Sequence, residues 1–244
     1  MLKCGDNVKI KKKIIIVLAI LVLIGFIIAG IYINKGYKMY KQAIMQMSLA
    51  EKIEEIKSLD SFVPIEEMPI DYLNALIAVE DHRFYEHGAV DIISIARAIF
   101  TNVKELELQE GGSTITQQTA KNLYFTQEKK LERKIAEIFL ASKLEKEYEK
   151  KDILELYVNT SYFGTGYYGV KDAAKGYYDK ELKDLTLWEC TMLAGIPNAP
   201  NVYAPNKKPE LGKQRQKQVI QKMVKYGYIT GEQGDKLLEE QKNY

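Results

Sequence analysis

The sequence predicts a mainly α-helical protein in which one N-terminal transmembrane helix precedes a helical body. Three observations support this prediction. An uncharged, apolar run of 20 residues lies near the N-terminus, at residues 14–33. The apolar residues of the remaining chain recur in helical stretches, and no convincing segment alternates apolar and polar residues as a half-buried strand would. The chain has no internal repeat, and its 244 residues are enough for one sizeable core or two small lobes.

The charge divides unevenly between the two parts of the chain. Residues 1–33 contain five lysines and one acid, a net charge of +4, whereas the other 211 residues contain 30 basic and 32 acidic side chains. A nearly neutral body excludes a broad basic surface for nucleic acid. The two cysteines, Cys4 and Cys190, are too few for a disulfide framework.

The run at residues 14–33, IIIVLAILVLIGFIIAGIYI, spans about 30 Å as an α-helix, which is the thickness of a hydrocarbon core. A cleaved signal peptide is the alternative, but its apolar region is usually only about 7–15 residues long and ends in a small-residue cleavage site. We therefore expect a cytoplasmic basic tail at 1–13, a membrane helix at 14–33, a stalk at 34–60 and a body at 61–244. Lysines crowd the N-terminal flank, which predicts a cytoplasmic N-terminus and an exported body.

The helices of the body follow in chain order. Pro69 precedes the apolar run Tyr72–Glu80 and marks the start of a helix, because proline fits the first helical turn. A second apolar helical stretch follows at Ile92–Phe100, and a glycine pair then interrupts the pattern. Further helices are expected at residues 116–122, 131–146 and 152–159 and, after a glycine- and tyrosine-rich segment at 161–178, as an amphipathic pair within 209–241.

Two common kinds of catalytic site are excluded. The two histidines, His82 and His87, are too few and too close for a catalytic triad or a dedicated zinc site. The sequence contains no Ser-x-x-Lys, so an acyl-serine site of the penicillin-binding type is absent. Carboxylates, amides and cations at suggestive spacings remain.

Glu80 ends an apolar helix, where partial burial would raise the pKa of its carboxyl group toward the range that a general base needs. The alternative is a helix-end acid paired with Arg83, three residues further on. The residues around Glu80 do not decide between these interpretations.

Gln117, Gln118 and Lys121 share one face of a predicted helix. They follow a glycine pair and two hydroxyl residues, Ser113 and Thr114, either of which can cap the helix. Backbone amides at such a helix start, with a lysine nearby, can bind an anion. A plain polar helix face is an equal alternative.

Arg133 and Glu137 lie four residues apart and Lys134 and Glu137 three apart, so two cations flank one carboxylate. A surface salt-bridge cluster, which contributes about 0–1 kcal/mol to stability, is the alternative.

Five short patterns occur in a fixed order: EDHRFYEH at 80–87, GGSTITQQTAKN at 111–122, RKIAE at 133–137, ILELYVN with YFG at 153–164, and LAGIPNAP at 193–200. Together they resemble the peptidoglycan glycosyltransferases of family 51, which are either single-function membrane enzymes or the first module of class A penicillin-binding proteins. One departure is visible at 87–91, HGAVD, where the glycine stands one place earlier than in the usual His-x-Gly-x-Asp. The missing Ser-x-x-Lys and the end at Tyr244 favour the monofunctional form.

The resemblance implies a lysozyme-like helical main lobe with a smaller membrane-proximal lobe. Residues 92–108 are the candidate for contact with the membrane, and a core helix is the alternative, which we favour for Ile92–Ile99. The resemblance also implies that lipid II is polymerised into β-1,4-linked strands by an inverting displacement that releases undecaprenyl diphosphate. A lytic, glycan-cleaving enzyme of lysozyme-like fold and a catalytically silent scaffold are the competing hypotheses.

The resemblance assigns roles to individual residues. Glu80 is expected to be the general base, and Lys121, Arg133 and Lys134 are expected to neutralise the diphosphate. Glu137, beside two cations whose charge should lower its pKa, is expected to orient them or to help hold a divalent cation, Mg²⁺ or Mn²⁺. Ser113, Thr114, Gln117 and Gln118 should bind sugar and phosphate oxygens, and Asp81 and Arg83 complete the substrate-binding set by fixing the first motif. Expected partners are lipid II, the growing glycan strand, the lipid bilayer and other cell-wall synthesis or division proteins, with the protein located in the bacterial cell membrane.

Overall fold

A computed structural model describes residues 4–105, 111–126, 128 and 130–242. These residues form helices, turns and one isolated antiparallel bridge between Tyr162 and Tyr168, without a named strand in the described part of the chain. The α-helices are α1 (Cys4–Gln46), α2 (Leu49–Lys57), α3 (Ile70–Glu80), α4 (Ile92–Glu105), α5 (Ile115–Tyr124), α6 (Leu131–Glu147), α7 (Lys150–Thr160), α8 (Val170–Tyr178), α9 (Leu187–Gly195), α10 (Pro200–Tyr203), α11 (Pro209–Lys225) and α12 (Gly231–Lys242). Three short 3₁₀ helices lie at Ile65–Glu67, Leu182–Asp184 and Ile196–Asn198. The mainly helical prediction is confirmed.

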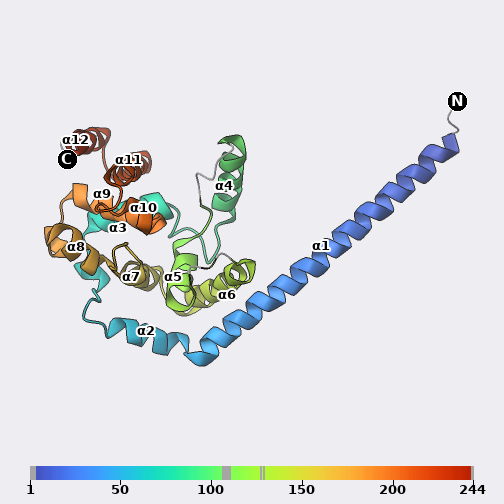
Figure 1. Ribbon diagram of the computed structural model, residues 1–244, viewed down its shortest axis with the longest axis horizontal. Helices are drawn as coiled ribbons and strands as arrows, with labels where there is room; N and C mark the ends of the chain where they lie inside the picture. The colour runs from blue at the N-terminus through green and yellow to red at the C-terminus, as the bar shows by residue number, and fades with distance from the viewer. Residues whose placement is uncertain (1–3, 106–110, 127, 129, 243–244) are drawn as a thin grey trace.

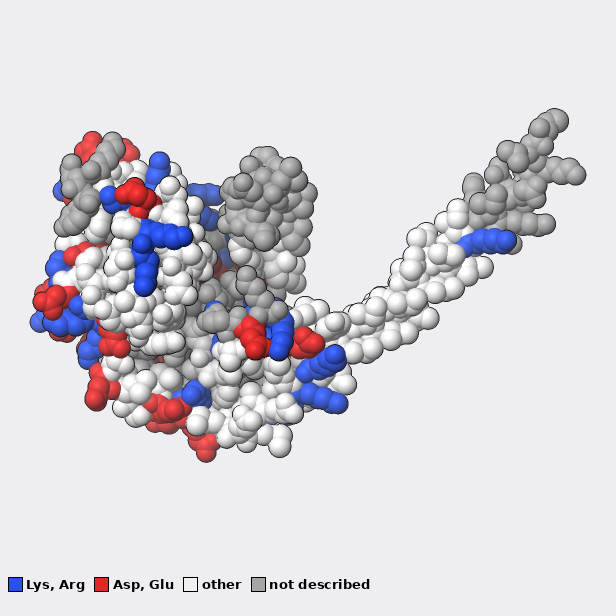
Figure 2. Space-filling model, in the orientation of Figure 1, with Lys and Arg blue, Asp and Glu red and all other residues white. Residues whose placement is uncertain are grey.

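Helix α1 projects away from a compact group of the other helices (Figure 1). Its segment Lys13–Gln46 is long and apolar enough to cross a membrane, and its most apolar window is not buried. Figure 2 shows the uncharged stretch of α1 between basic side chains near its two ends. The predicted span at 14–33 therefore lies inside a longer continuous helix.

The segment at 34–60 is not a separate stalk. Helix α1 continues through it to Gln46 and packs against α6, and α2 places Leu49 and Ile53 in the hydrophobic core. Ser48 begins α2 with a capping box, in which its side chain and that of Glu51 each accept a backbone N–H of the other residue. The packed body therefore begins before residue 61, because this segment contributes buried side chains to it.

The core is built around α3. Tyr72, Ala75 and Leu76 are fully buried, and α3 packs against α9 and α11. On the other side of the body, α5 packs against both α6 and α7. The apolar run that predicted α3 thus supplies the centre of the core, and the end of this helix places Glu80 at the edge of that core.

Helix α4 differs from the prediction of a core helix at Ile92–Ile99. It stands to one side of the other helices (Figure 1), and Ile92 and Ile93 are 77% and 57% exposed. Phe100 is also exposed, whereas Ala98 is buried. The last part of the predicted stretch 92–108 lies outside the described residues.

Candidate active site

A cleft of about 960 Å³ opens among α3, α4, α5, α6 and α11. Helix ends and cleft-facing helix surfaces form its walls. Seven of the eleven predicted site residues line it: Glu80, Ser113, Gln118, Lys121, Arg133, Lys134 and Glu137.

Glu80 lies at the C-terminal end of α3 with a side chain that is only 5% exposed. Its Oε2 accepts a hydrogen bond from Gln118 Nε2 at 2.9 Å, and its Oε1 accepts one from Arg215 Nη2 at 3.1 Å. Arg83 pairs instead with Asp91 and Glu86, at 3.4 and 3.5 Å. The alternative of a helix-end pair between Glu80 and Arg83 is therefore wrong, and the carboxylate faces the cleft.

Arg215, on α11, is a site residue that the sequence analysis missed. Its guanidinium also donates to Gln218 Oε1 at 3.0 Å and to the carbonyl oxygen of Gly195 at 3.4 Å. The absence of a side chain at Gly195 leaves room for the Arg215 side chain, because a Cβ atom at position 195 would lie 2.9 Å from Arg215 Cγ. Arg215 is the only arginine among the lysines of α11, and this weak signal is all that the sequence offers.

Glu137 lies on α6 between two cations and is 2% exposed. Arg133 Nη1 donates to its Oε1, and Lys134 Nζ donates to its Oε2 at 3.0 Å. Lys134 Nζ also donates to Ser113 Oγ at 2.7 Å. The carboxylate of Glu137 is buried and the Lys134 side chain is 38% exposed toward the cleft, so the group is not a salt bridge on the open surface.

Lys121, one turn from the end of α5, adds a third cation to this end of the cleft. Burial lowers the pKa of Lys121; the charge of Glu137 opposes this, and the positive charges of Arg133 and Lys134 lower the pKa further. Three cations against one carboxylate leave this end of the cleft positive, which suits an anionic ligand.

His82 lines another part of the same cleft beside further cations. Arg97 Nη1 donates to its Nε2 at 3.2 Å, and its ring stacks on Tyr226 with centroids 4.1 Å apart. Burial, followed by the charges of Arg97 and Lys222, lowers the pKa of His82 to about 4. The imidazole is therefore neutral near pH 7 and accepts the hydrogen bond from Arg97.

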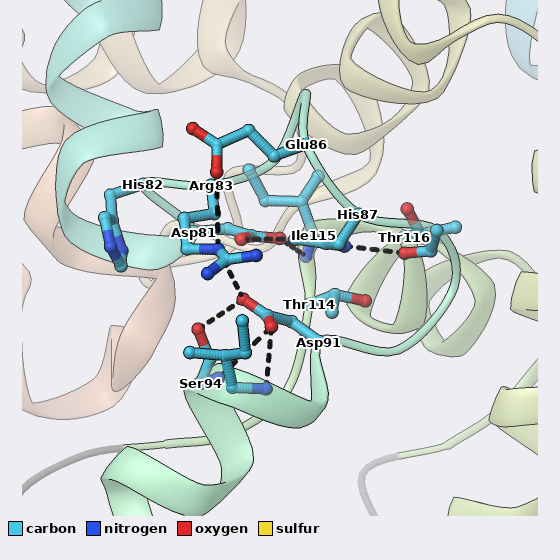
Figure 3. Close-up of polar contacts among 12 residues, drawn as sticks. Asp81, His82, Arg83, Glu86, His87, Asp91, Ser94, Thr114, Ile115 and Thr116 are labelled. Atoms are coloured by element: carbon cyan, nitrogen blue, oxygen red, sulfur yellow. Dashed lines mark hydrogen bonds and ion pairs between the residues drawn. The ribbon is translucent and has the colours of Figure 1, made fainter.

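Asp81 and Arg83 lie outside the cleft lining and hold the loop after α3 in place (Figure 3). Asp81 Oδ2 accepts from the backbone N–H of Ile115 at 3.0 Å, and its Oδ1 lies 2.8 Å from His87 Nε2. Burial raises the pKa of Asp81, and these two hydrogen bonds oppose that rise. Asp81 thus ties the loop to the start of α5, and Arg83 pairs with two acids of the loop. The polar atoms of both residues hold the loop and do not line the cleft.

Thr114 and Gln117, expected to bind sugar and phosphate oxygens, form the capping box of α5 instead. Thr114 Oγ1 accepts the N–H of Gln117 at 3.1 Å, and Gln117 Oε1 accepts the N–H of Thr114 at 3.2 Å. Both side chains are buried. This cap defines where α5 begins, and therefore which of its residues, Gln118 and Lys121, face the cleft.

The position of the glycine in the sequence HGAVD has no visible consequence. Nothing lies within 4 Å of the place where a Cβ at Gly88 would be, and the φ angle of this residue is not positive. The carbonyl oxygen of Gly88 accepts a hydrogen bond from His87 Nδ1 at 2.7 Å. The departure from the family pattern therefore leaves the loop intact.

The residues around Glu137 do not fit a divalent cation held by the protein. Both carboxylate oxygens of Glu137 already accept from cations. Within the described part of the chain, the one cluster of three groups with metal-ligand chemistry is Asp81, His87 and Asp91. That cluster lies outside the cleft, and its oxygens bond to the loop and to Ser94.

Comparisons with known proteins give consistent matches. The family described as Transglycosylase matches residues 46–224. Penicillin-binding protein 1A of Aquifex aeolicus is 45% identical over 172 residues, which are 70% of this chain and 24% of that protein. Penicillin-binding protein 1F of Bacillus subtilis is 39% identical over 235 residues, 91% of this chain and 33% of that protein.

Two further matches differ in extent. A candidate transglycosylase of Cupriavidus necator is 41% identical over 195 residues, 80% of this chain and 84% of that protein. A crystal structure of penicillin-binding protein 1A from Haemophilus influenzae has a TM-score of 0.37 and 28% identity over 52% of this chain and 16% of that one. The chain thus spans about a quarter of the length of penicillin-binding protein 1A of Aquifex aeolicus and about a third of that of penicillin-binding protein 1F of Bacillus subtilis.

Proposed function

This chain belongs to the transglycosylase family, and we propose that it polymerises lipid II into β-1,4-linked glycan strands and releases undecaprenyl diphosphate. One observation carries the proposal. A buried carboxylate that is not bonded to Lys121, Arg133 or Lys134, that of Glu80, shares a cleft with these three cations, which lie on neighbouring helices.

The chemistry of the reaction calls for this arrangement. The donor sugar is α-linked to diphosphate, so a β-linked product requires inversion in one in-line displacement. A base must take the proton of the acceptor's 4-hydroxyl group, and positive charge must stabilise the departing diphosphate. Glu80 supplies the base, because its carboxylate faces the cleft and is held by Gln118 and Arg215.

The three cations meet the second requirement. Arginine can bind phosphate oxygens as a two-pronged donor, and lysine provides a compact positive charge. Glu137 holds Arg133 and Lys134 on one face of α6, so that their charge is already in position when the diphosphate departs. Ser113, which accepts from Lys134, and Gln118 are the polar groups that remain to bind sugar or phosphate oxygens.

The proposal includes a place in the cell. Lipid II and the released lipid are both membrane components, so a cleft close to the bilayer suits them. We assign α1 as a single-pass anchor with a cytoplasmic N-terminus and an extracytoplasmic body in the bacterial cell membrane. The exposed Ile92, Ile93 and Phe100 of α4 are the candidate second contact with the bilayer.

In this proposal a divalent cation, Mg²⁺ or Mn²⁺, binds in the cleft together with the substrate. Glu137 offers no unused oxygen, so the diphosphate itself would bring the ion into the cleft. Other cell-wall synthesis or division proteins remain proposed partners. The lytic hypothesis has no observation in its favour, because an enzyme that cleaves a sugar bridge needs an acid but no diphosphate pocket.

The test is a polymerisation assay with the purified full-length protein in detergent, lipid II and Mg²⁺ or Mn²⁺. We expect long glycan strands. In a parallel reaction without lipid II, polymeric glycan should remain intact. Shortened glycan together with no polymer from lipid II would overturn the proposal in favour of a lytic enzyme, and no reaction in either assay would favour a silent scaffold.

A further inference from the structure

The anchor helix does not end at the membrane but packs directly on a helix of the cleft. Helix α1 continues past its apolar span and lies along α6. The two helices approach each other closely at Gly36, which is buried. A Cβ atom at this position would lie 2.5 Å from Ile135 Cγ2 and 2.9 Å from the carbonyl oxygen of Glu132. No larger residue fits at position 36 unless one of the two helices moves.

Aromatic contacts extend the interface beyond Gly36. Tyr37 meets Phe139 edge-on with ring centroids 5.3 Å apart, and Tyr40 stacks on the same ring at 5.9 Å. Such ring pairs stabilise a contact beyond the area that they bury. The exposed ion pair between Lys35 and Glu132, at 3.8 Å, adds little. The contact therefore depends on close packing and aromatic rings.

The residues of α6 that face the anchor alternate along the sequence with those that face the cleft. The anchor side carries Glu132, Ile135 and Phe139. The cleft side carries Arg133, Lys134 and Glu137. With 3.6 residues per turn, the two sets lie on opposite faces of the helix. A helix is stiff over these few turns, so a displacement of one face moves the other.

The position of Gly36 along α1 gives this contact a meaning for the reaction. Gly36 is three residues beyond Ile33, the last residue of the apolar run, or about 5 Å along the helix axis. The diphosphate of a lipid-linked sugar joins the lipid to the sugar and therefore lies at the membrane surface. With residues 14–33 spanning the membrane as proposed above, the contact between α1 and α6 begins about 5 Å beyond the end of that span, near the level of the diphosphate.

We propose that Gly36 is a positioning residue, which lets the anchor approach α6 closely enough to fix Arg133 and Lys134 at the level of the substrate's diphosphate. The inference rests on the proposed function, since it concerns the same site. The anchor then acts as a rigid support for the cations in addition to tethering the protein.

The test compares two leucine substitutions in the same helix of the full-length protein. Gly36→Leu places a side chain against Ile135 and the backbone of α6, whereas a Cβ at Gly30 meets no atom within 4 Å. Gly30→Leu is therefore the matched control. The probe is inorganic pyrophosphate, measured by calorimetric titration in detergent. Gly36→Leu should weaken its binding at least tenfold, and Gly30→Leu should leave it within twofold of wild type.

The same proteins are assayed for lipid II polymerisation, alone and with Lys134→Met. If Gly36 acts through Lys134, Gly36→Leu should lower the rate at least tenfold in the wild-type background and by much less in Lys134→Met, since coupled sites are not additive. A purely structural role would give the same factor in both backgrounds. Gly36→Ala, with an intermediate expected effect, replaces Gly36→Leu if that variant loses its helical circular dichroism.

The outcomes separate the two proposals. Pyrophosphate binding that is unaffected by Gly36→Leu, or absent in the wild type, overturns the inference. Weakened binding in Gly36→Leu without any polymerisation by the wild type supports the inference and overturns the proposed function.

Discussion

Glu80 and Glu137 are two buried glutamates of one cleft with different neighbours. Glu80 is bonded to one cation, Arg215, and to the neutral amide of Gln118. Glu137 is bonded to two cations, Arg133 and Lys134, and its charge also acts on the pKa of Lys121. Glu80 therefore forms an ion pair with one cation and Glu137 with two. In the proposed reaction, Glu80 accepts the proton of the acceptor hydroxyl group, whereas Glu137 holds Arg133 and Lys134 in position.

The comparison predicts the largest effect for Glu80→Gln. Glutamine has nearly the same shape and can keep one partner of the glutamate, but it cannot accept a proton. General base catalysis contributes about 10²–10⁴-fold to a rate, so the initial rate of lipid II polymerisation should fall by that factor. The circular dichroism and thermal unfolding of the variant are the controls. A rate within twofold of wild type would refute the role of Glu80 as the base.

Glu137→Gln should have a smaller effect. The substitution leaves Arg133, Lys134 and Lys121 in the cleft but replaces a charged acceptor with a neutral amide, so the cations lose their fixed positions and keep their charge. We expect a rate about 10-fold below wild type in the same assay, since charge-assisted hydrogen bonds contribute roughly twice as much as neutral ones. An effect as large as that of Glu80→Gln would break the comparison, because both acids would then be equally essential.

Substitutions of Arg215 test how much its ion pair with Glu80 contributes to the reaction. Arg215→Met keeps the apolar part of the side chain and removes the donor to Glu80 Oε1. The buried carboxylate then loses its charged partner, and we expect kcat to fall about 10-fold, close to the cost of one lost charged hydrogen bond. Arg215→Lys should recover part of the rate. Equal rates for all three proteins would show that Gln118 alone positions Glu80.

The comparison also separates what the sequence could predict from what it could not. Helices α5, α6 and α7 begin and end within two residues of their predicted limits, because capping residues and apolar spacing are local signals. The pairing of Arg133 and Lys134 with Glu137 is confirmed for the same reason, since all three lie within five residues of one helix.

The sequence could not predict contacts between segments that lie far apart along the chain. Arg215 lies 135 residues from Glu80, and nothing near either residue indicates the other. The packing of α1 on α6 was missed because the segment after the apolar run is polar and reads as a linker. Thr114 and Gln117 matched a motif by residue type, but only the structure shows that their polar atoms cap a helix. A motif thus identifies a site without distinguishing the residues that touch the ligand from those that support them.

The smallest effect concerns His82, which tests whether burial and the neighbouring cations of this part of the cleft keep its imidazole neutral. Its pKa of about 4 in the folded protein lies below the value of about 6.5 expected for the unfolded chain. As the pH falls from 6.5 toward 4, only the unfolded chain takes up a proton at this site, so stability that is present above pH 6.5 is progressively lost. Wild-type Tm should therefore fall more between pH 7 and pH 5 than the Tm of His82→Phe, which can keep the ring contact with Tyr226. Because the ring is partly exposed to screening solvent, we expect a difference of about 2 °C between the two shifts, measured by thermal unfolding. Parallel curves for the two proteins would mean that burial and the charges of Arg97 and Lys222 do not lower the pKa of His82 in the folded protein.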